Sequence, residues 1–239
     1  MVFKATLSGI DGSGKSSALD QLSRRLSHDG YTVAHTLRPF YIDMPKGRRE
    51  RYAQRYEETM DCLHQVADKL KQKTFIGMIN VIHHCGVSKI IEDYAIKKFK
   101  PDVVLAGRDT LLDPFAYSAY YFSFTKSLPV WIRKRVDELM NKSRADMTFY
   151  MDIDPDLAYE RILKRIEKEK KESNELREKW AHMHENPKDL RFLKQEFETA
   201  IDLFGKGGQV IVRIDASKPL DDIVEEIFTR VKSNNHLTA

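Results

Sequence analysis

Cysteine is scarce in this chain: its 239 residues include only two, Cys62 and Cys85. Two thiols cannot form a disulfide framework. The cysteines and the nearby histidines, within residues 62–64 and 83–85, match no standard zinc spacing. The plain interpretation is an intracellular, cytoplasmic protein with free thiols.

Long apolar runs are also missing, and none approaches membrane-spanning length. The chain enters an apolar segment at residue 2, so we expect no signal peptide and no membrane partner. Lys and Arg number 40 against 36 Asp and Glu, a formal net charge of +4. This excess is too mild to indicate nucleic-acid binding. The length and the 41% hydrophobic content fit one domain over residues 1–239.

The most informative segment is Gly9-Ile10-Asp11-Gly12-Ser13-Gly14-Lys15-Ser16. It has the spacing of a phosphate-binding loop, in which glycines let the backbone amides surround an anion. Lys15 can reach the β- and γ-phosphates of a nucleotide, and the Ser16 hydroxyl can hold Mg²⁺. An apolar strand precedes the loop, and residues 17–26 have helical spacing after it. The motif therefore stands in its required context.

Five short apolar segments alternate with helical ones, and this pattern predicts an α/β fold with a parallel sheet and helices on both faces. The expected strands are residues 2–8, 31–37, 102–106, 146–152 and 209–215. Polar residues follow each strand, so we expect a ligand site at the carboxyl edge of the sheet.

Residues 46–99 predict two long helices. The first, rich in arginine and glutamate, is interpreted as a solvated face. The second begins near Phe75 and carries many isoleucines. We expect it to be buried in the core or against a second subunit, and favour a homodimer built on residues 75–97.

Arg108 and Asp109 end the third strand, where an arginine can reach bound phosphates; a local ion pair is the alternative. Pro155 opens a helix that Asp154 or its neighbour is expected to cap, and Asp152 is a candidate to support a metal through water. Beyond residue 161 the chain is strongly charged, which is typical either of a solvated helix or of a mobile lid closing over phosphates. We favour a lid over about 161–185, with Arg161 and Arg165 on one face.

These pieces together resemble the thymidylate kinase family. The loop, with its acidic Asp11, is similar to that family's loop, and the similarity extends from residue 2 to about 231. The other segments that carry the resemblance are Thr36-Leu37-Arg38-Pro39, Gly107-Arg108-Asp109 with Ala116-Tyr117, Asp152-Ile153-Asp154-Pro155 with the arginines after it, and Val210 to Ala216.

The resemblance implies a P-loop kinase fold with a five-stranded parallel sheet and a helical lid, and an ATP- and Mg²⁺-dependent kinase acting on a nucleotide, nucleoside or similar small molecule. The implied catalytic residues are Lys15, Asp11, Arg108, Arg161 and Arg165. ATP would bind Gly9, Gly12, Ser13, Gly14, Lys15, Ser16 and Ser17, with Ala216 and Lys218 near the adenine. Acceptor ligands would be Asp11, Arg38, Arg108, Asp109 and Tyr117, and Ser16 would hold the metal.

The chain departs from the family pattern around the acceptor. Gly107 replaces an aspartate, Ser118 replaces a glutamine, and no glutamate separates Arg38 from Pro39. The Phe75 helix has no arginine to clamp an acceptor phosphate, although arginines at 48, 49 or 51 could replace it. We therefore expect dTMP to be a poor acceptor. The alternative hypothesis, favoured by Gly107, is a non-catalytic nucleotide-binding switch or scaffold.

Overall fold

A seven-stranded mixed sheet forms the centre of the computed structural model, with strand order β4-β3-β2-β5-β1-β6-β7. The structure describes residues 2–37, 39–70, 77, 88–122, 129–132, 134, 144–172 and 184–233. The strands are β1 Phe3–Ser8, β2 Val33–His35, β3 Tyr41–Met44, β4 Arg48–Arg51, β5 Val103–Ala106, β6 Met147–Asp152 and β7 Ile211–Asp215. The helices are α1 Lys15–His28, α2 Gln54–Leu70, α4 Ser88–Phe99, α5 Leu112–Tyr121, α8 Pro155–Glu172, α9 Pro187–Lys206 and α10 Leu220–Lys232.

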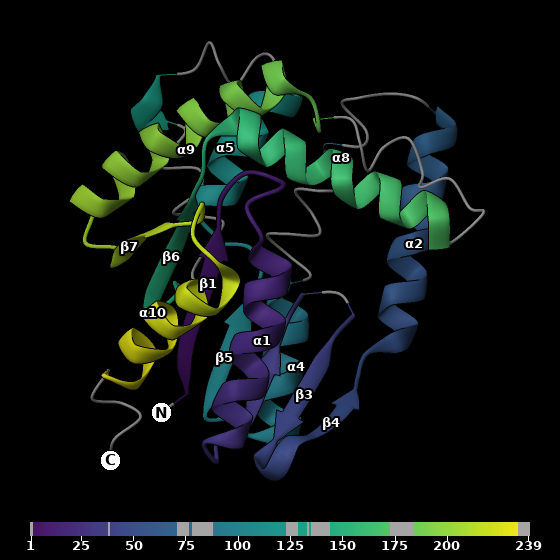
Figure 1. Cartoon of the computed structure of the whole chain (residues 1–239), viewed down its shortest axis with the longest axis vertical. Coiled ribbons are helices and arrows are strands. Elements are labelled where there is room, and N and C mark those ends of the chain that lie inside the picture. The colour runs from purple at the N-terminus through teal and green to yellow at the C-terminus, as the bar shows by residue number, and fades with distance from the viewer. Residues whose placement is uncertain are drawn as a thin grey trace.

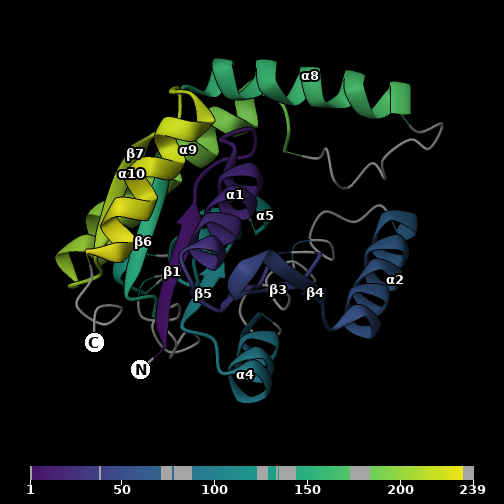
Figure 2. The same cartoon turned by 60° about the horizontal axis from the view of Figure 1, so that its bottom comes forward.

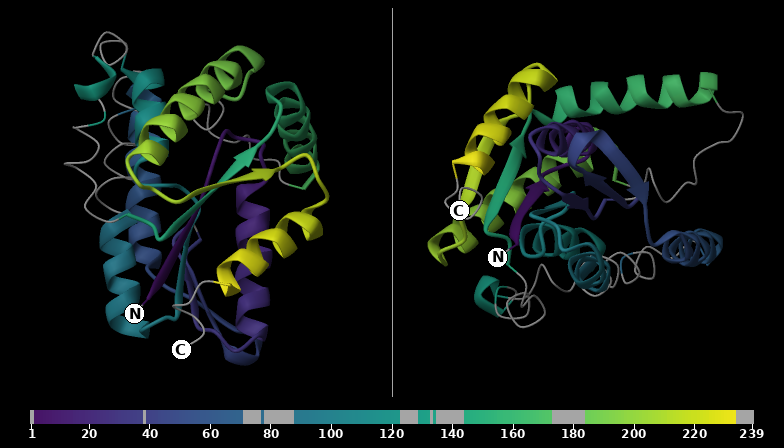
Figure 3. Two further views of the ribbon diagram at one scale, coloured as in Figure 1. Left: turned by 90° about the vertical axis from the view of Figure 1, so that its left-hand side faces the viewer. Right: turned by 90° about the horizontal axis from the view of Figure 1, so that it is seen from below.

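The five strands predicted from the sequence are confirmed, and each pairs in parallel with its neighbours among them. They are short and apolar because both faces of the sheet are covered. Helices α1 and α10 lie on one face, and α4, α5 and α9 lie on the other (Figure 3). The main core joins strand residues such as Phe3 and Phe149 to Leu22 of α1, Phe115 of α5 and Phe197 of α9.

Strands β3 and β4 correct one prediction, since residues 46–53 do not begin a helix. They form part of an antiparallel hairpin on β2, and helix α2 starts only at Gln54. Lys46 and Gly47 turn the chain with φ values of 66° and 76°. Arg49 lies directly opposite Asp43 and donates to both carboxylate oxygens, at 2.5 and 2.6 Å. The charge run therefore lies mostly in an edge strand, in which Arg49 is half-buried and the other three residues are exposed.

The carboxyl ends of the parallel strands lie at one edge of the sheet, and helix α8 crosses above that edge (Figure 1). The two ends of the described chain lie at the opposite edge, and α8 extends sideways beyond the sheet (Figure 2). This arrangement puts the loop after β1 directly beneath the start of α8.

The predicted helix from Phe75 lies almost wholly outside the described residues. Helix α4, which covers the described end of the predicted segment, buries Ile91 in a smaller core cluster and leaves Ile90 63% exposed. Within the described ranges, no helix has both the length and the apolar character needed to cross a membrane.

Candidate functional site: a phosphate loop beneath a charged helix

The loop after β1 packs so tightly that two of its positions accept only glycine. Gly9 has a φ of 138°, and a Cβ there would lie 2.9 Å from the carbonyl oxygen of Met151. Gly12 has a φ of 81°, and a Cβ there would lie 2.3 Å from the carbonyl oxygen of Ala158. Both are left-handed or extended positive conformations in which a side chain is strained. The loop is thus wedged between the end of β6 and the first turn of α8.

Lys15 is held by the loop itself. Its Nζ donates to the carbonyl oxygens of Gly9 and Ile10, each at 2.8 Å, and to Ser13 Oγ at 3.4 Å. Burial lowers the pKa of Lys15 to about 8, although the charge of Asp11 acts in the opposite direction. Ser13 is fully buried, so it supports the lysine from behind.

A cavity of about 460 Å³ opens between this loop and α8. It is lined by Asp11, Gly12, Gly14, Lys15, Ser16, Ser17, Leu37, Gly107, Arg108, Arg161, Ile162 and Arg165. Nine of these were named as site residues from the sequence. The first turn of α1 borders the cavity and receives no side-chain cap from Gly14, so its amides suit an anion.

Asp11 lies at the centre of a buried polar cluster. Its carboxylate accepts a hydrogen bond from Tyr117 Oη at 3.2 Å and another from His184 Nε2, and Arg108 lies 3.7 Å away. Burial acts to raise the pKa of Asp11, but the charges of His184, Lys15 and Arg108 and the bond from His184 hold it well below its usual range. Asp11 therefore stays ionised.

Arg108 contacts two carboxylates and an aromatic ring. Its Nη1 lies 3.2 Å from Asp113 Oδ1, and its guanidinium lies 4.8 Å from the centre of the Tyr117 ring. Burial acts to lower the pKa of Arg108, but Tyr117, Asp11 and Asp113 hold it well above its usual value. The guanidinium is therefore a fixed positive charge at the wall of the cavity.

The two arginines predicted in the lid occupy different surroundings. Arg161 donates to the carbonyl oxygens of Ala216 at 2.8 Å and Ser217 at 3.5 Å, in the loop after β7. Arg165, one turn further along α8, pairs with Glu185, and its charge acts to lower the pKa of Lys15. Arg165 therefore belongs to the phosphate side of the cavity, and Arg161 to the β7 side.

Curated relatives of the chain over most of its length include thymidylate kinases. The chain is 26% identical over 228 residues to thymidylate kinase of Geobacillus thermodenitrificans, covering 94% of this chain and 87% of the relative. It is 25% identical over 224 residues to probable thymidylate kinase 2 of Saccharolobus solfataricus, covering 92% and 90%. No family model matches the chain.

Solved structures agree on the fold. A deoxyadenosine kinase from M. mycoides, solved with dCMP and dCDP, superposes with a TM-score of 0.61 over 97% of this chain and all of that one, at 16% identity. The same enzyme with bound dATP gives a TM-score of 0.56. Over most of its length this chain is similar to thymidylate kinases.

Gly107, which stands where the family pattern described above has an aspartate, is closely packed against Leu37. A Cβ at this position would lie 2.8 Å from Cδ1 of Leu37, which also lines the cavity. An aspartate cannot stand here unless Leu37 moves.

In the described part of the chain, no group of three or more His, Cys, Asp and Glu side chains could hold a metal.

Asp109 corrects a prediction, because it does not reach the cavity. It is 2% exposed and accepts hydrogen bonds from Thr6 and Thr148 at 2.8 and 2.7 Å and from the amides of Leu111 and Leu112. We interpret it as a structural residue that ties β1 and β6 to the start of α5, not as a substrate ligand.

Asp113 is a site residue that sequence reasoning missed. It is fully buried beneath Arg108, and its Oδ2 accepts from Ser8 Oγ at 2.5 Å and from the amide of Asp109 at 2.9 Å. Burial raises its pKa, although Arg108 and Ser8 act against this. It therefore orients Arg108 from behind the cavity wall.

Two further predicted residues stand apart from the cavity. Ala216 is buried beside Arg161, and Lys218 lies 3.5 Å from Glu226, so both belong to the loop after β7. Arg38 lies outside the described residues. The capping role predicted for Asp154 is confirmed, since its Oδ1 accepts from the amides of Asp156 and Leu157.

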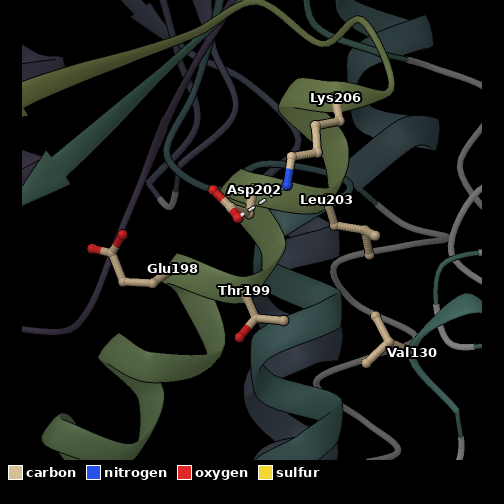
Figure 4. Close-up of a pocket in the computed structure, with 6 residues that line it drawn as sticks. All are labelled: Val130, Glu198, Thr199, Asp202, Leu203 and Lys206. Atoms are coloured by element: carbon tan, nitrogen blue, oxygen red, sulfur yellow. Dashed lines mark hydrogen bonds and ion pairs between the residues drawn. The ribbon is translucent and has the colours of Figure 1, made fainter.

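A second hollow, of about 560 Å³, lies on the outer side of α9 and holds none of these residues (Figure 4). Its walls are Val130, Glu198, Thr199, Asp202, Leu203 and Lys206. The Lys206–Asp202 ion pair, 3.3 Å apart, runs along the exposed face of the helix. Pairs of this kind are typical of a solvated surface.

Proposed function

We propose that this protein is an ATP- and Mg²⁺-dependent kinase that phosphorylates a nucleotide, nucleoside or related small molecule. The observation that carries the proposal is the single cavity in which the phosphate loop, Asp11, Arg108 and Arg165 meet at the carboxyl edge of the sheet. Its relatives over most of the chain are kinases of this substrate class.

On the phosphate side, the amides of the loop and Lys15 would cradle the β- and γ-phosphates. Phosphoryl transfer needs mainly positioning and neutralisation of charge, and Lys15 and Arg165 supply two cations for it. On binding, phosphate oxygens would replace the loop carbonyls as partners of Lys15 Nζ, and would compete with Glu185 for Arg165.

The residues present fit a magnesium ion bound mainly through phosphates. The side chain of Ser16 is exposed at the cavity wall, and Mg²⁺ usually keeps several waters beside one or two protein oxygens. Bound there, the ion would neutralise charge on the phosphates. Gly107 supplies no carboxylate to it, which is the feature that favours the alternative of a non-catalytic switch.

On the acceptor side, Asp11 would orient the acceptor hydroxyl, with Arg108 and Tyr117 beside it. A carboxylate whose pKa lies well below its usual range is a weak base. A loose transition state for phosphoryl transfer requires little base catalysis, so orientation is the role that fits Asp11 better than proton removal.

The hairpin arginines do not supply the charge that a monophosphate acceptor needs. Arg49 is held by Asp43 and Asp20, and Arg51 pairs with Glu57. Arg48 lies opposite Met44, at the end of the hairpin far from the carboxyl edge of β2. The occupied hairpin arginines support the expectation that dTMP fits poorly. They leave Arg38 or Arg108 to contact any negative charge on the acceptor.

A coupled assay of ADP release over a panel of nucleotides, nucleosides and sugars tests the proposal, with Lys15→Ala as the matched control. We expect turnover with at least one acceptor, abolished by Lys15→Ala, and a kcat/KM for dTMP below roughly 10⁴ M⁻¹s⁻¹. Nucleotide binding without turnover on the whole panel would favour the switch. If the turnover of Lys15→Ala were within tenfold of wild type, Lys15 would not have the proposed catalytic role.

A further inference from the structure

Two consecutive side chains just before α9 connect the phosphate loop to the charged helix. His184 Nε2 bonds to the carboxylate of Asp11, and the neighbouring Glu185 pairs with Arg165 of α8. Both side chains are nearly buried: His184 is 8% exposed, and the Glu185 side chain is 4% exposed. The contact between His184 and Asp11 joins residues 173 positions apart. His184 and Glu185 therefore contact one residue in each wall of the cavity, Asp11 of the phosphate loop and Arg165 of α8.

The start of α9 fixes this segment in place. Asn186 caps the helix, its Oδ1 accepting from the amide of Asp189 at 3.0 Å, and Pro187 occupies the first helical position. Tyr120 of α5 donates to the carboxylate of Asp189 at 2.9 Å. The chain at His184 is thus tied to two helices of the core and is not free to drift from the loop.

Aromatic rings also fix the orientation of the histidine. The ring of His184 lies edge-on to Tyr117, Tyr120 and Tyr121, with centroid distances of 5.3, 5.9 and 6.4 Å. Its Nδ1 lies 3.4 Å from Tyr121 Oη, which leaves Nε2 directed at Asp11. A ring packed on three sides cannot rotate without displacing α5.

We propose that His184 is a positioning residue for Asp11, acting on phosphoryl transfer through that carboxylate and not by touching substrate. The inference rests on the proposed kinase function. His184 and Tyr117 both bond to Oδ2 of Asp11, so they fix the plane of the carboxylate and leave Oδ1, 3.7 Å from Arg108, to meet the acceptor. A misplaced orienting group costs rate more than binding.

The test is a double-mutant cycle on the acceptor found in the assay above. We expect His184→Ala to lower kcat by at least about tenfold with the KM for ATP within about threefold, and His184→Gln, which keeps a donor, to restore most of the loss. In an Asp11→Asn background, His184→Ala should change kcat by less than about twofold. His28→Gln, an exposed histidine at the end of α1, is the control. An equal loss in both backgrounds would overturn the proposal.

A second measurement does not depend on activity. In protein labelled with ¹⁵N-histidine, Asp11→Asn should shift the ring-nitrogen signals of His184 and leave those of His28 unchanged. Unchanged His184 signals would overturn the positioning role even in an active kinase. A wild-type protein that turns over no acceptor would overturn the proposed function, and the spectra would still decide the link between His184 and Asp11.

Discussion

At the scale of single residues, His35 is the buried group with the clearest consequence for stability. It lies at the end of β2, 4% exposed, beside the ring of Tyr41, and neither ring nitrogen has a hydrogen-bond partner among the described residues. Burial and the charge of Arg49 lower its pKa to about 4, against the weaker opposing effect of Asp43 and Asp20. The folded protein therefore holds His35 neutral.

We expect His35 to lower the free energy of unfolding as the pH falls from about 6.5 to 4. The unfolded chain binds the proton first, near pH 6.5, so the free energy of unfolding decreases as the pH falls through that window. The loss is on the order of 3 kcal/mol, since each pKa unit is worth about 1.4 kcal/mol. Urea unfolding of wild type and His35→Leu from pH 7.5 to 4 measures it. Identical pH slopes in the two proteins would contradict the prediction.

The sequence identified the site residues that are contiguous or that end a strand, because local spacing determines where they point. Lys15, Ser16 and Arg108 belong to this group. His184 and Asp113 were missed because their partners come from distant segments, and no local pattern distinguishes them from surface residues. Asp109 was misassigned for a similar reason: its partners, Thr6 and Thr148, lie on two other strands.

At the scale of elements, the β3–β4 hairpin is held by a buried ionic network. Asp43 is 2% exposed and is bonded by Arg49 and by Ser23 of α1, and Arg49 also contacts Asp20 of that helix. Removing the arginine would leave a buried carboxylate without its cation, which costs more than the pair itself contributes.

We expect Arg49→Ala to lower the free energy of unfolding by about 3 kcal/mol and to leave kcat/KM nearly unchanged, because this arginine faces α1 and not the cavity. Arg48→Ala, on the same strand and exposed, should cost less than about 0.5 kcal/mol. Denaturation at pH 7.5 and steady-state kinetics measure the two effects. A large loss of activity in a stable Arg49→Ala protein would return this residue to the acceptor site.

Helix α8 separates two roles that the sequence assigned equally to its arginines. Arg165→Ala should lower kcat by roughly 100-fold or more, because its charge acts near Lys15, whereas Arg161→Ala should mainly raise the KM for ATP, because it contacts the loop after β7. Steady-state kinetics of both variants decides this. Equal effects of the two substitutions on kcat would instead support one shared catalytic role for both arginines.

The lid predicted over 161–185 is held at both ends in the structure. Ile162 is 1% exposed and His184 is 8% exposed, so both positions are packed against the rest of the protein. Hydrogen exchange across residues 163–172 should slow when ATP and acceptor are both bound. Unaltered exchange would identify α8 as a rigid surface helix.

At the scale of the whole molecule, the proposed homodimer would use the long helices over 75–97. In the described part, α4 leaves Ile90 63% and Tyr94 43% exposed. Apolar side chains of this size are typical of a covered face when they occur together.

We expect light scattering at micromolar concentration to give about twice 27.8 kDa, and Ile90→Asp to shift the protein toward the monomer without unfolding it. Leu220→Asp, at a less exposed apolar position (37%) at the start of α10, serves as the control. A wild-type mass of 27.8 kDa would rule out the dimer.

The parallel core could be predicted from the sequence, since its strands are apolar segments set apart by helices and its loop is a specific motif. The β3–β4 hairpin could not be predicted, because the run of charges over residues 48–51 is also typical of a solvated helix. Nothing in the local pattern indicates that Arg49 lies opposite Asp43. The turn signal at Pro45, Lys46 and Gly47 was the evidence available for it.

Strand β4 closes one border of the sheet with the sequence Arg48-Arg49-Glu50-Arg51. A border strand carries unpaired backbone groups on which another chain can add, and bulky charged side chains oppose that addition. A second copy approaching this border would bring the exposed Arg48 and Arg51 of one molecule against those of the other. The same hairpin that buries a carboxylate on its inner side should therefore keep concentrated solutions of the protein from aggregating through this border.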